Sequence, residues 1–134
     1  MNLRQLKKRL EEEGCSPLNY AVGGRASDAF CLIKEAGRWK VCYSERGRDS
    51  DPIFTSTSES EACEYFLDHM CRQPNQHLVG TFDSDEEAKA FEVEVVRAGA
   101  RPFRNDVPAS IHGTPRFRVF VAGKDIHLVR PLMS

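Results

Sequence analysis

The sequence lacks the paired cysteines of a disulfide framework or a zinc site. Its five cysteines, at positions 15, 31, 42, 63 and 71, are odd in number, and no two stand in a CxxC spacing. The four histidines are scattered along the chain, without metal-ligand spacing. We therefore expect free cysteines that serve mostly as small apolar core residues, with Cys15 and Cys71 more exposed near helix ends. No metal and no cofactor is expected.

Long apolar runs are also missing. No stretch approaches the roughly 18 consecutive apolar residues of a membrane span. The N-terminus, MNLRQLKKRLEEEG, is charged and lacks the apolar centre of a secretory signal. These two absences predict a cytoplasmic protein that makes no contact with a membrane.

The chain has no excess of either charge. Nineteen basic residues face 20 acidic ones, for a formal net charge of −1. Because no overall positive field attracts phosphate, nucleic acid is not the expected partner. The length of 134 residues, with 40% hydrophobic and 29% charged residues, is typical of one compact globular domain.

Catalytic motifs are absent. The sequence contains no GxSxG, no HExxH, no phosphate-binding glycine loop and no dinucleotide fingerprint. Helix capping and solvation account for each cluster of carboxylates. We therefore expect a protein that is not an enzyme, since catalysis would require groups that only the fold brings together.

The first half predicts a helix, a strand pair and a second helix. Leu3, Leu6 and Leu10 repeat at helical spacing, and Gly14 ends that helix. Alternation over residues 29–35 and 38–45, joined by Ala36-Gly37, predicts an antiparallel hairpin whose aromatic residues belong to the core rather than to a ligand platform. The remaining expected elements are a short strand over 18–22, an irregular RGRDSDP loop, a brief strand at 53–54 and a Ser58-capped helix to residue 71.

The second half predicts a strand over 77–82, a Ser84-capped helix ended by Gly99, and strands over 100–105, 116–122 and 126–130. The segment RQPNQ, residues 72–76, is the expected hinge. We expect a single compact domain over 1–134 of class α+β, with antiparallel sheets and about three helices packed on one side. Its two closely packed halves are a helix–strands–helix module, 1–72, and a strand–helix–strand–strand module, 77–134.

The run WKVCYSERGRDSD…FTSTSESEACEYFL resembles small bacterial immunity proteins encoded beside polymorphic or contact-dependent toxins. The likeness covers residues 1–70, and Cys42 stands where the family pattern has an aromatic residue. The positions that carry it are Leu32, Trp39, Val41, Tyr43, Ser44, Glu45, Arg46, Gly47, Phe54, Ser58, Glu61, Ala62, Cys63, Tyr65 and Phe66. The second half, with GTFDSDEEAKAF, is similar in its order of elements to sporulation-related repeats, which we take as a likeness of fold alone.

The first resemblance implies a non-enzymatic inhibitor that binds the C-terminal domain of a cognate bacterial toxin and occludes its active site. Clustered charges on the loop and second helix are the expected contact surface, since close charge pairs set the register of a complex. That toxin-binding surface comprises Glu45, Arg46, Asp49, Asp51, Glu64 and Asp68.

Two other interpretations remain open. The domain can serve as a non-enzymatic regulatory or adaptor module. Alternatively, the arginine-rich second half can bind single-stranded nucleic acid or a glycan, although its aromatic residues are needed for the core and a charged sheet edge explains its arginines more simply. The residues concerned are Arg97, Arg101, Arg104, Arg116, Arg118 and Arg130, interleaved with Phe103, Phe117 and Phe120.

Overall fold

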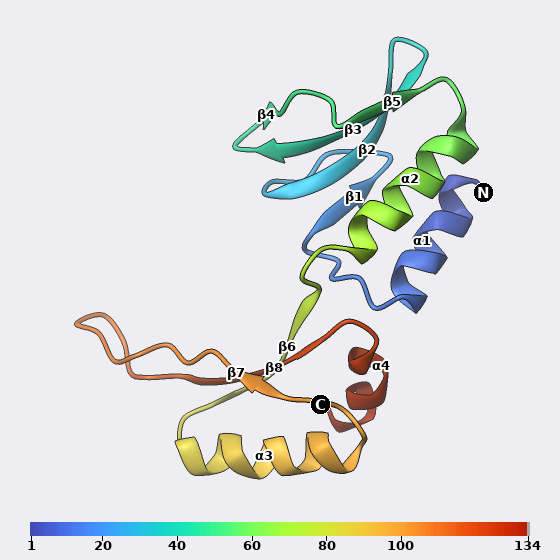
Figure 1. The fold of residues 1–134 in the computed structure, drawn as a ribbon. Coiled ribbons are helices and arrows are strands. Elements are labelled where there is room, and N and C mark those ends of the chain that lie inside the picture. Colours follow the sequence, from blue (N-terminus) through green and yellow to red (C-terminus); the bar gives the residue numbers. More distant parts are fainter. Residues whose placement is uncertain (134) are drawn as a thin grey trace. The chain divides into compact units, whose positions relative to one another are not determined.

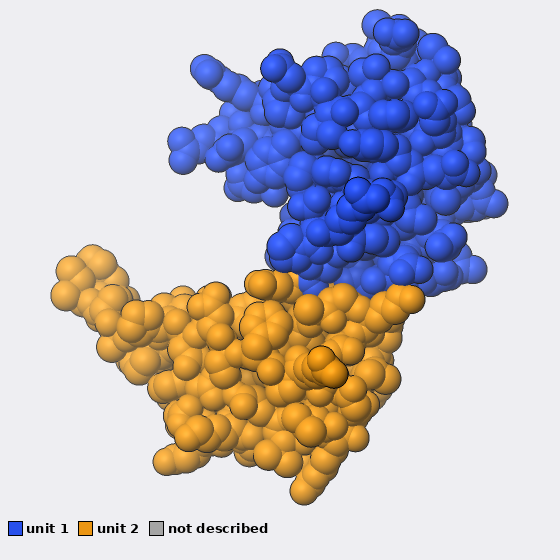
Figure 2. Space-filling model, viewed as in Figure 1, with its two compact units in different colours: residues 1–75 blue, residues 76–134 orange. Residues whose placement is uncertain are grey.

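The computed structural model describes residues 1–133 and has an α+β fold, with four α-helices and two mainly antiparallel sheets among those residues. The chain divides into two compact units, Met1–Asn75 and Gln76–Ser134 (Figures 1 and 2). The division lies within the RQPNQ segment. None of the helices in residues 1–133 has the length and apolar character that crossing a membrane requires.

Unit 1 is a five-stranded sheet with two helices on one face (Figure 1). Its strands run in the order β1-β2-β3-β4, and β5 pairs with β3. The bounds of β2 and β3 are those predicted from the alternation of their residues. The elements are α1 (Leu3–Glu12), β1 (Tyr20–Val22), β2 (Ala29–Glu35), β3 (Arg38–Glu45), β4 (Arg48–Asp49), β5 (Phe54–Ser56) and α2 (Glu59–Cys71).

Two tight turns shape the central hairpins of unit 1. Ala36 and Gly37 have φ angles of 52° and 78°, and Arg46 and Gly47 have φ angles of 52° and 77°. Two successive left-handed residues are typical of a type I′ turn, whose twist matches that of the flanking strands. The second turn brings β4 antiparallel to β3, so the expectation of an irregular RGRDSDP loop is wrong at its start.

The sheet is antiparallel as expected except at one edge. β1 pairs with β2 in parallel, with Ala21 opposite Cys31. Residues 23–28 carry the chain back across the strand ends, and Gly23, at φ 83°, donates its amide to the Leu32 carbonyl (2.7 Å). The predicted strand is also shorter than expected, because Leu18 is 85% exposed and lies outside β1.

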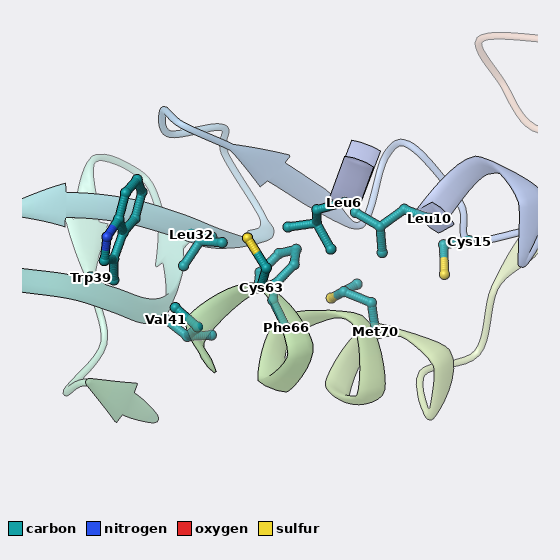
Figure 3. Packing of buried hydrophobic residues seen from close by; sticks show 10 residues of the cluster. Leu6, Leu10, Cys15, Leu32, Trp39, Val41, Cys63, Phe66 and Met70 are labelled. Carbon is teal, nitrogen blue, oxygen red and sulfur yellow. The ribbon is translucent and has the colours of Figure 1, made fainter. Parts of the chain in front are cut away.

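The helices close the core of unit 1 in the predicted way. The Ser58 hydroxyl accepts from the Glu61 amide at 3.1 Å and begins α2, while a complete capping box between Asn2 and Gln5 begins α1. Figure 3 shows the side chains of both helices meeting those of the sheet. The buried core consists of Leu6, Leu10, Cys15, Leu32, Trp39, Val41, Ala62, Cys63, Phe66 and Met70.

Unit 2 is a three-stranded antiparallel sheet in the order β6-β8-β7, with a core shared by its two α-helices. Val119 and Val121 of β8 are fully buried against this core. The elements are β6 (Gln76–Phe82), α3 (Asp85–Arg97), β7 (Phe103–Arg104), β8 (Phe117–Ala122), α4 (Asp125–Val129) and a short 3-10 helix, η1 (Arg130–Leu132).

The predicted last strand over 126–130 is wrong, because these residues form α4 and the start of η1. Gly123, at φ 56°, turns the chain, and its carbonyl accepts from the Ile126 amide at 3.2 Å. Ile126 and Val129 then enter the core at helical spacing. The Asp125 carboxylate accepts from the Arg101 amide at 3.0 Å, which ties the helix start to the segment before β7.

Candidate functional site

The six residues of the predicted toxin-binding surface lie in two places on unit 1. Glu45, Arg46 and Asp49 line a hollow at the β3–β4 hairpin, whereas Glu64 and Asp68 line a smaller one beside α2. Asp51 is exposed and lines neither hollow. Five of the six predicted residues therefore line one of two hollows.

The hairpin hollow is an open concavity of about 590 Å³. Its remaining lining residues are Tyr43, Arg48 and Ser50. The Ser50 hydroxyl accepts from the Tyr43 amide and donates to the Asp51 carbonyl, both at 2.9 Å, so it fixes the chain that leaves β4. Acidic and basic side chains thus surround this hollow. The backbone beneath them is fixed by a type I′ turn and by the two hydrogen bonds of the Ser50 hydroxyl.

Asp49 differs from its neighbours, because it belongs to a network of four charges on the sheet face opposite the helices. Arg25 donates its Nε to both carboxylate oxygens of Asp49, at 3.0 and 3.2 Å, and its Nη2 to Glu35. Lys40 lies 3.5 Å from Glu35 and 3.6 Å from Asp49. The same sheet face carries the buried Cys31, Ile33 and Cys42.

The network shifts the pKa values of its acids. The hydrogen bond from Arg25, together with charges from Arg25 and Lys40, lowers the pKa of Asp49 below its ordinary 3.8. Arg25 and Lys40 also lower the pKa of Glu35. Asp49 is thereby held ionised within the fold, and its first role is structural.

The other charged residues of the hairpin have no such partners. Glu45, Arg46 and Arg48 are exposed, and none of them forms an ion pair with another residue of the described chain. Burial, and next the charges of Asp28 and Glu45, raise the pKa of Tyr43. The hairpin therefore presents one carboxylate that is unpaired within the described chain, two guanidinium groups and a phenol at its edge.

The hollow beside α2 is smaller, about 300 Å³, and lies between the two helices. Glu64 and Asp68 share it with Arg9, Glu13 and Leu67, among others. Asp68 is paired with Arg72 at 2.9 Å, one turn further along α2. Exposed pairs of this kind contribute little to stability, so they leave the carboxylate available to a stronger partner.

A row of aromatic rings beside α2 was not anticipated from the sequence. The ring of Phe30 contacts those of Tyr43 and His69, with centroids 5.1 and 4.5 Å apart, and Tyr65 stacks on Phe54 at 4.2 Å. Burial, and then the charge of Arg72, lower the pKa of His69. Phe30 lies opposite Tyr43 in the register of β2 against β3. The alternation of residues along each strand predicts the strands but not this register, so it did not predict the contact between the two rings.

All five cysteines are free thiols, and four are buried. The expectation that Cys15 is among the more exposed is wrong, because it is 3% exposed and packs in the core of unit 1, whereas Cys71 is exposed. Burial, followed by the proximity of Cys71, raises the pKa of Cys15 to about 12.

In unit 2 the fold separates the predicted cluster of arginine and phenylalanine. Arg104 lies on the helix side, where it pairs with Asp85 and Glu92 at 2.8 Å and with Asp106 at 3.0 Å. Phe117 packs against the core. Phe103, Phe120 and Arg118 come together on the other face of the sheet.

Residues 1–133 contain no group of three or more histidine, cysteine or acidic side chains placed to hold a metal ion. Comparison of the chain with protein-family models, with curated proteins and with solved structures gives no match.

Proposed function

We propose that the protein is an immunity protein, and that it neutralises a cognate bacterial toxin domain by contacting it through the β3–β4 hairpin of unit 1. The observation that carries this proposal is a set of exposed charges around a preformed hollow, Glu45, Arg46 and Arg48, which form no ion pair among residues 1–133. Charged side chains at a docking edge set specificity and speed the encounter with a partner. Glu45 and Arg46 are also among the residues that carry the resemblance to immunity proteins.

The backbone conformation of the hairpin turn supports a role in binding. Because Arg46 and Gly47 already occupy the left-handed conformation, the turn loses little conformational entropy when a partner docks. Arg46 is the expected anchor, since arginine is enriched among the residues whose loss costs an interface most. Occlusion of the toxin's active site then follows from the bulk of the docked unit and requires no chemistry from the inhibitor.

The test uses the C-terminal domain of the large protein that a neighbouring gene encodes as the candidate toxin. Isothermal titration and growth rescue on co-expression are the paired readouts. Arg46→Asn removes the guanidinium while keeping a residue that favours the left-handed conformation of a type I′ turn. We expect this variant to lose at least about thirtyfold in affinity, as for the loss of a central arginine, and to lose rescue in parallel.

A second variant tests the competing surface. This variant replaces the acids outside the hairpin hollow, Asp51, Glu64 and Asp68, with lysine. We expect its affinity for the toxin domain to lie within a few-fold of that of the wild type. If that variant loses binding while Arg46→Asn retains it, the acidic residues on α2 and at Asp51 are the contact surface instead of the hairpin. Failure of the wild type to bind or rescue would refute the immunity function itself.

A further inference from the structure

The sheet of unit 2 has one covered face and one open face. Along β8, Val119 and Val121 enter the core with α3 and α4, so Arg118 and Phe120 lie on the opposite face. Figure 1 shows α3 below this sheet, and among the described residues of unit 2 no helix packs on the face that carries Phe120.

Flat groups gather on this open face. Phe103, opposite Phe120 in the register of β7 and β8, stacks with it at a centroid distance of 5.5 Å and an interplanar angle of 17°. The Arg118 guanidinium lies 5.2 Å from the Phe120 ring. Leu78, opposite Phe120 on β6, is 46% exposed. These groups form a platform of two aromatic rings, one guanidinium plane and one aliphatic side chain.

Many of the acids of unit 2 lie on the covered side of its sheet. Five acids lie on α3, on the covered side: Asp85, Glu86, Glu87, Glu92 and Glu94. Arg104, on that same side, forms ion pairs with Asp85, Glu92 and Asp106.

Among residues 1–133, the cations of the open face form no ion pair with an acid. Arg116 precedes Arg118 by two residues and is expected on the same side, and Arg101 precedes Phe103 by two. Neither Arg101 nor Arg116 forms an ion pair within residues 1–133. Arg118 donates its Nε to the Asn105 carbonyl at 2.7 Å, a bond that fixes the orientation of its plane.

We propose that this open face, the Phe103–Phe120–Arg118 platform with Arg116 beside it, binds single-stranded nucleic acid. Unpaired bases stack on aromatic rings and on arginine planes, and the phosphates meet the arginines. A duplex cannot stack its bases on these rings, because its bases are already stacked on one another inside the helix. The net charge of −1 does not oppose this binding, since the acids of α3 lie across the sheet and salt screens them within about 8 Å.

The experiment measures fluorescence anisotropy of the full chain with labelled oligo(U) and oligo(dT) of about twelve nucleotides, and with the matching duplex, over a salt series. We expect both single strands to bind and the duplex to bind more weakly. Phe103→Leu keeps apolar bulk but removes the ring, and should weaken single-strand binding about tenfold. Arg116→Gln should reduce the salt slope by about 0.7.

Two variants on the covered side are the matched controls. Phe91→Leu removes a ring near Phe82, and Arg97→Gln removes a guanidinium paired with Glu94 at 2.9 Å. Both should bind single strands like the wild type. Equal affinity for the duplex, equal losses in the control variants, or no binding at protein concentrations up to about 10⁻⁴ M would each overturn the proposal. So would binding of chitooligosaccharides in the absence of any binding to oligonucleotides.

Discussion

At the scale of single residues, Arg25 ties the charge network of unit 1 together. Its guanidinium contacts Asp49 and Glu35, whose pKa values are both lowered, first of all by their hydrogen bonds to Arg25. Because the folded-state pKa of Asp49 lies below its ordinary 3.8, ionised Asp49 stabilises the fold above that value, and this contribution is lost as the pH falls through the folded pKa.

This linkage predicts the effect of Arg25→Gln on the urea unfolding midpoint. At neutral pH the variant should unfold at a lower urea concentration than the wild type, and the difference should shrink as the pH falls below 3.8, since the carboxylates become protonated in both proteins. Arg46→Gln is the control, because Arg46 is exposed and has no ion pair among the described residues, and its midpoint should match the wild type throughout. A loss for Arg25→Gln that stays constant down to low pH would show that packing, and not charge, is the contribution of Arg25.

At the scale of elements, the turn between β2 and β3 contains a strained residue, Ala36, whose strain a substitution can relieve. Ala36 has φ 52°, a conformation that costs a residue with a β-carbon, and a type I′ turn favours Asn-Gly. We therefore expect Ala36→Asn to raise the free energy of unfolding by about 1 kcal/mol, measured by urea denaturation.

Gly37→Ala is the opposite substitution in the same turn. Gly37 has φ 78°, and a β-carbon added there would meet nothing within 4 Å, so its effect comes from the backbone conformation alone. It should lower stability by about 1 kcal/mol. If both substitutions shifted stability in the same direction, the turn type would not be the cause.

The elements also show which parts of the fold the sequence predicts and why. β2 and β3 were predicted to the residue because alternation and the Ala36-Gly37 turn are local signals. The helix at 125–129 was missed because its residues also alternate, and only Gly123 and the distant amide of Arg101 start it. The structural role of Asp49 could not be predicted for a similar reason: its partner Arg25 lies 24 residues away in the sequence, and no local pattern indicates that contact.

At the scale of the whole molecule, the two buried cores share no residue. Phe66 is fully buried in the core of unit 1, and Val119 is fully buried in that of unit 2. Truncating Phe66 to alanine removes an aromatic ring and leaves a cavity, which costs about 3–5 kcal/mol. Truncating Val119 to alanine removes two methyl groups and costs about 2 kcal/mol.

Hydrogen exchange followed by mass spectrometry reports where each loss is felt. Because neighbouring residues open together when they share a core, Phe66→Ala should speed exchange across residues 1–75 and leave 76–133 near wild-type rates, and Val119→Ala should do the reverse. With this pattern, each variant would destabilise the unit that carries one proposed surface while the other unit stays folded. Loss of toxin binding in Phe66→Ala would then point to the hairpin of unit 1, and loss of oligonucleotide binding in Val119→Ala to the open sheet of unit 2. Faster exchange throughout the chain in both variants would instead mean that the units unfold as one, and a loss of binding in either variant would then have to be corrected for the loss of the whole fold.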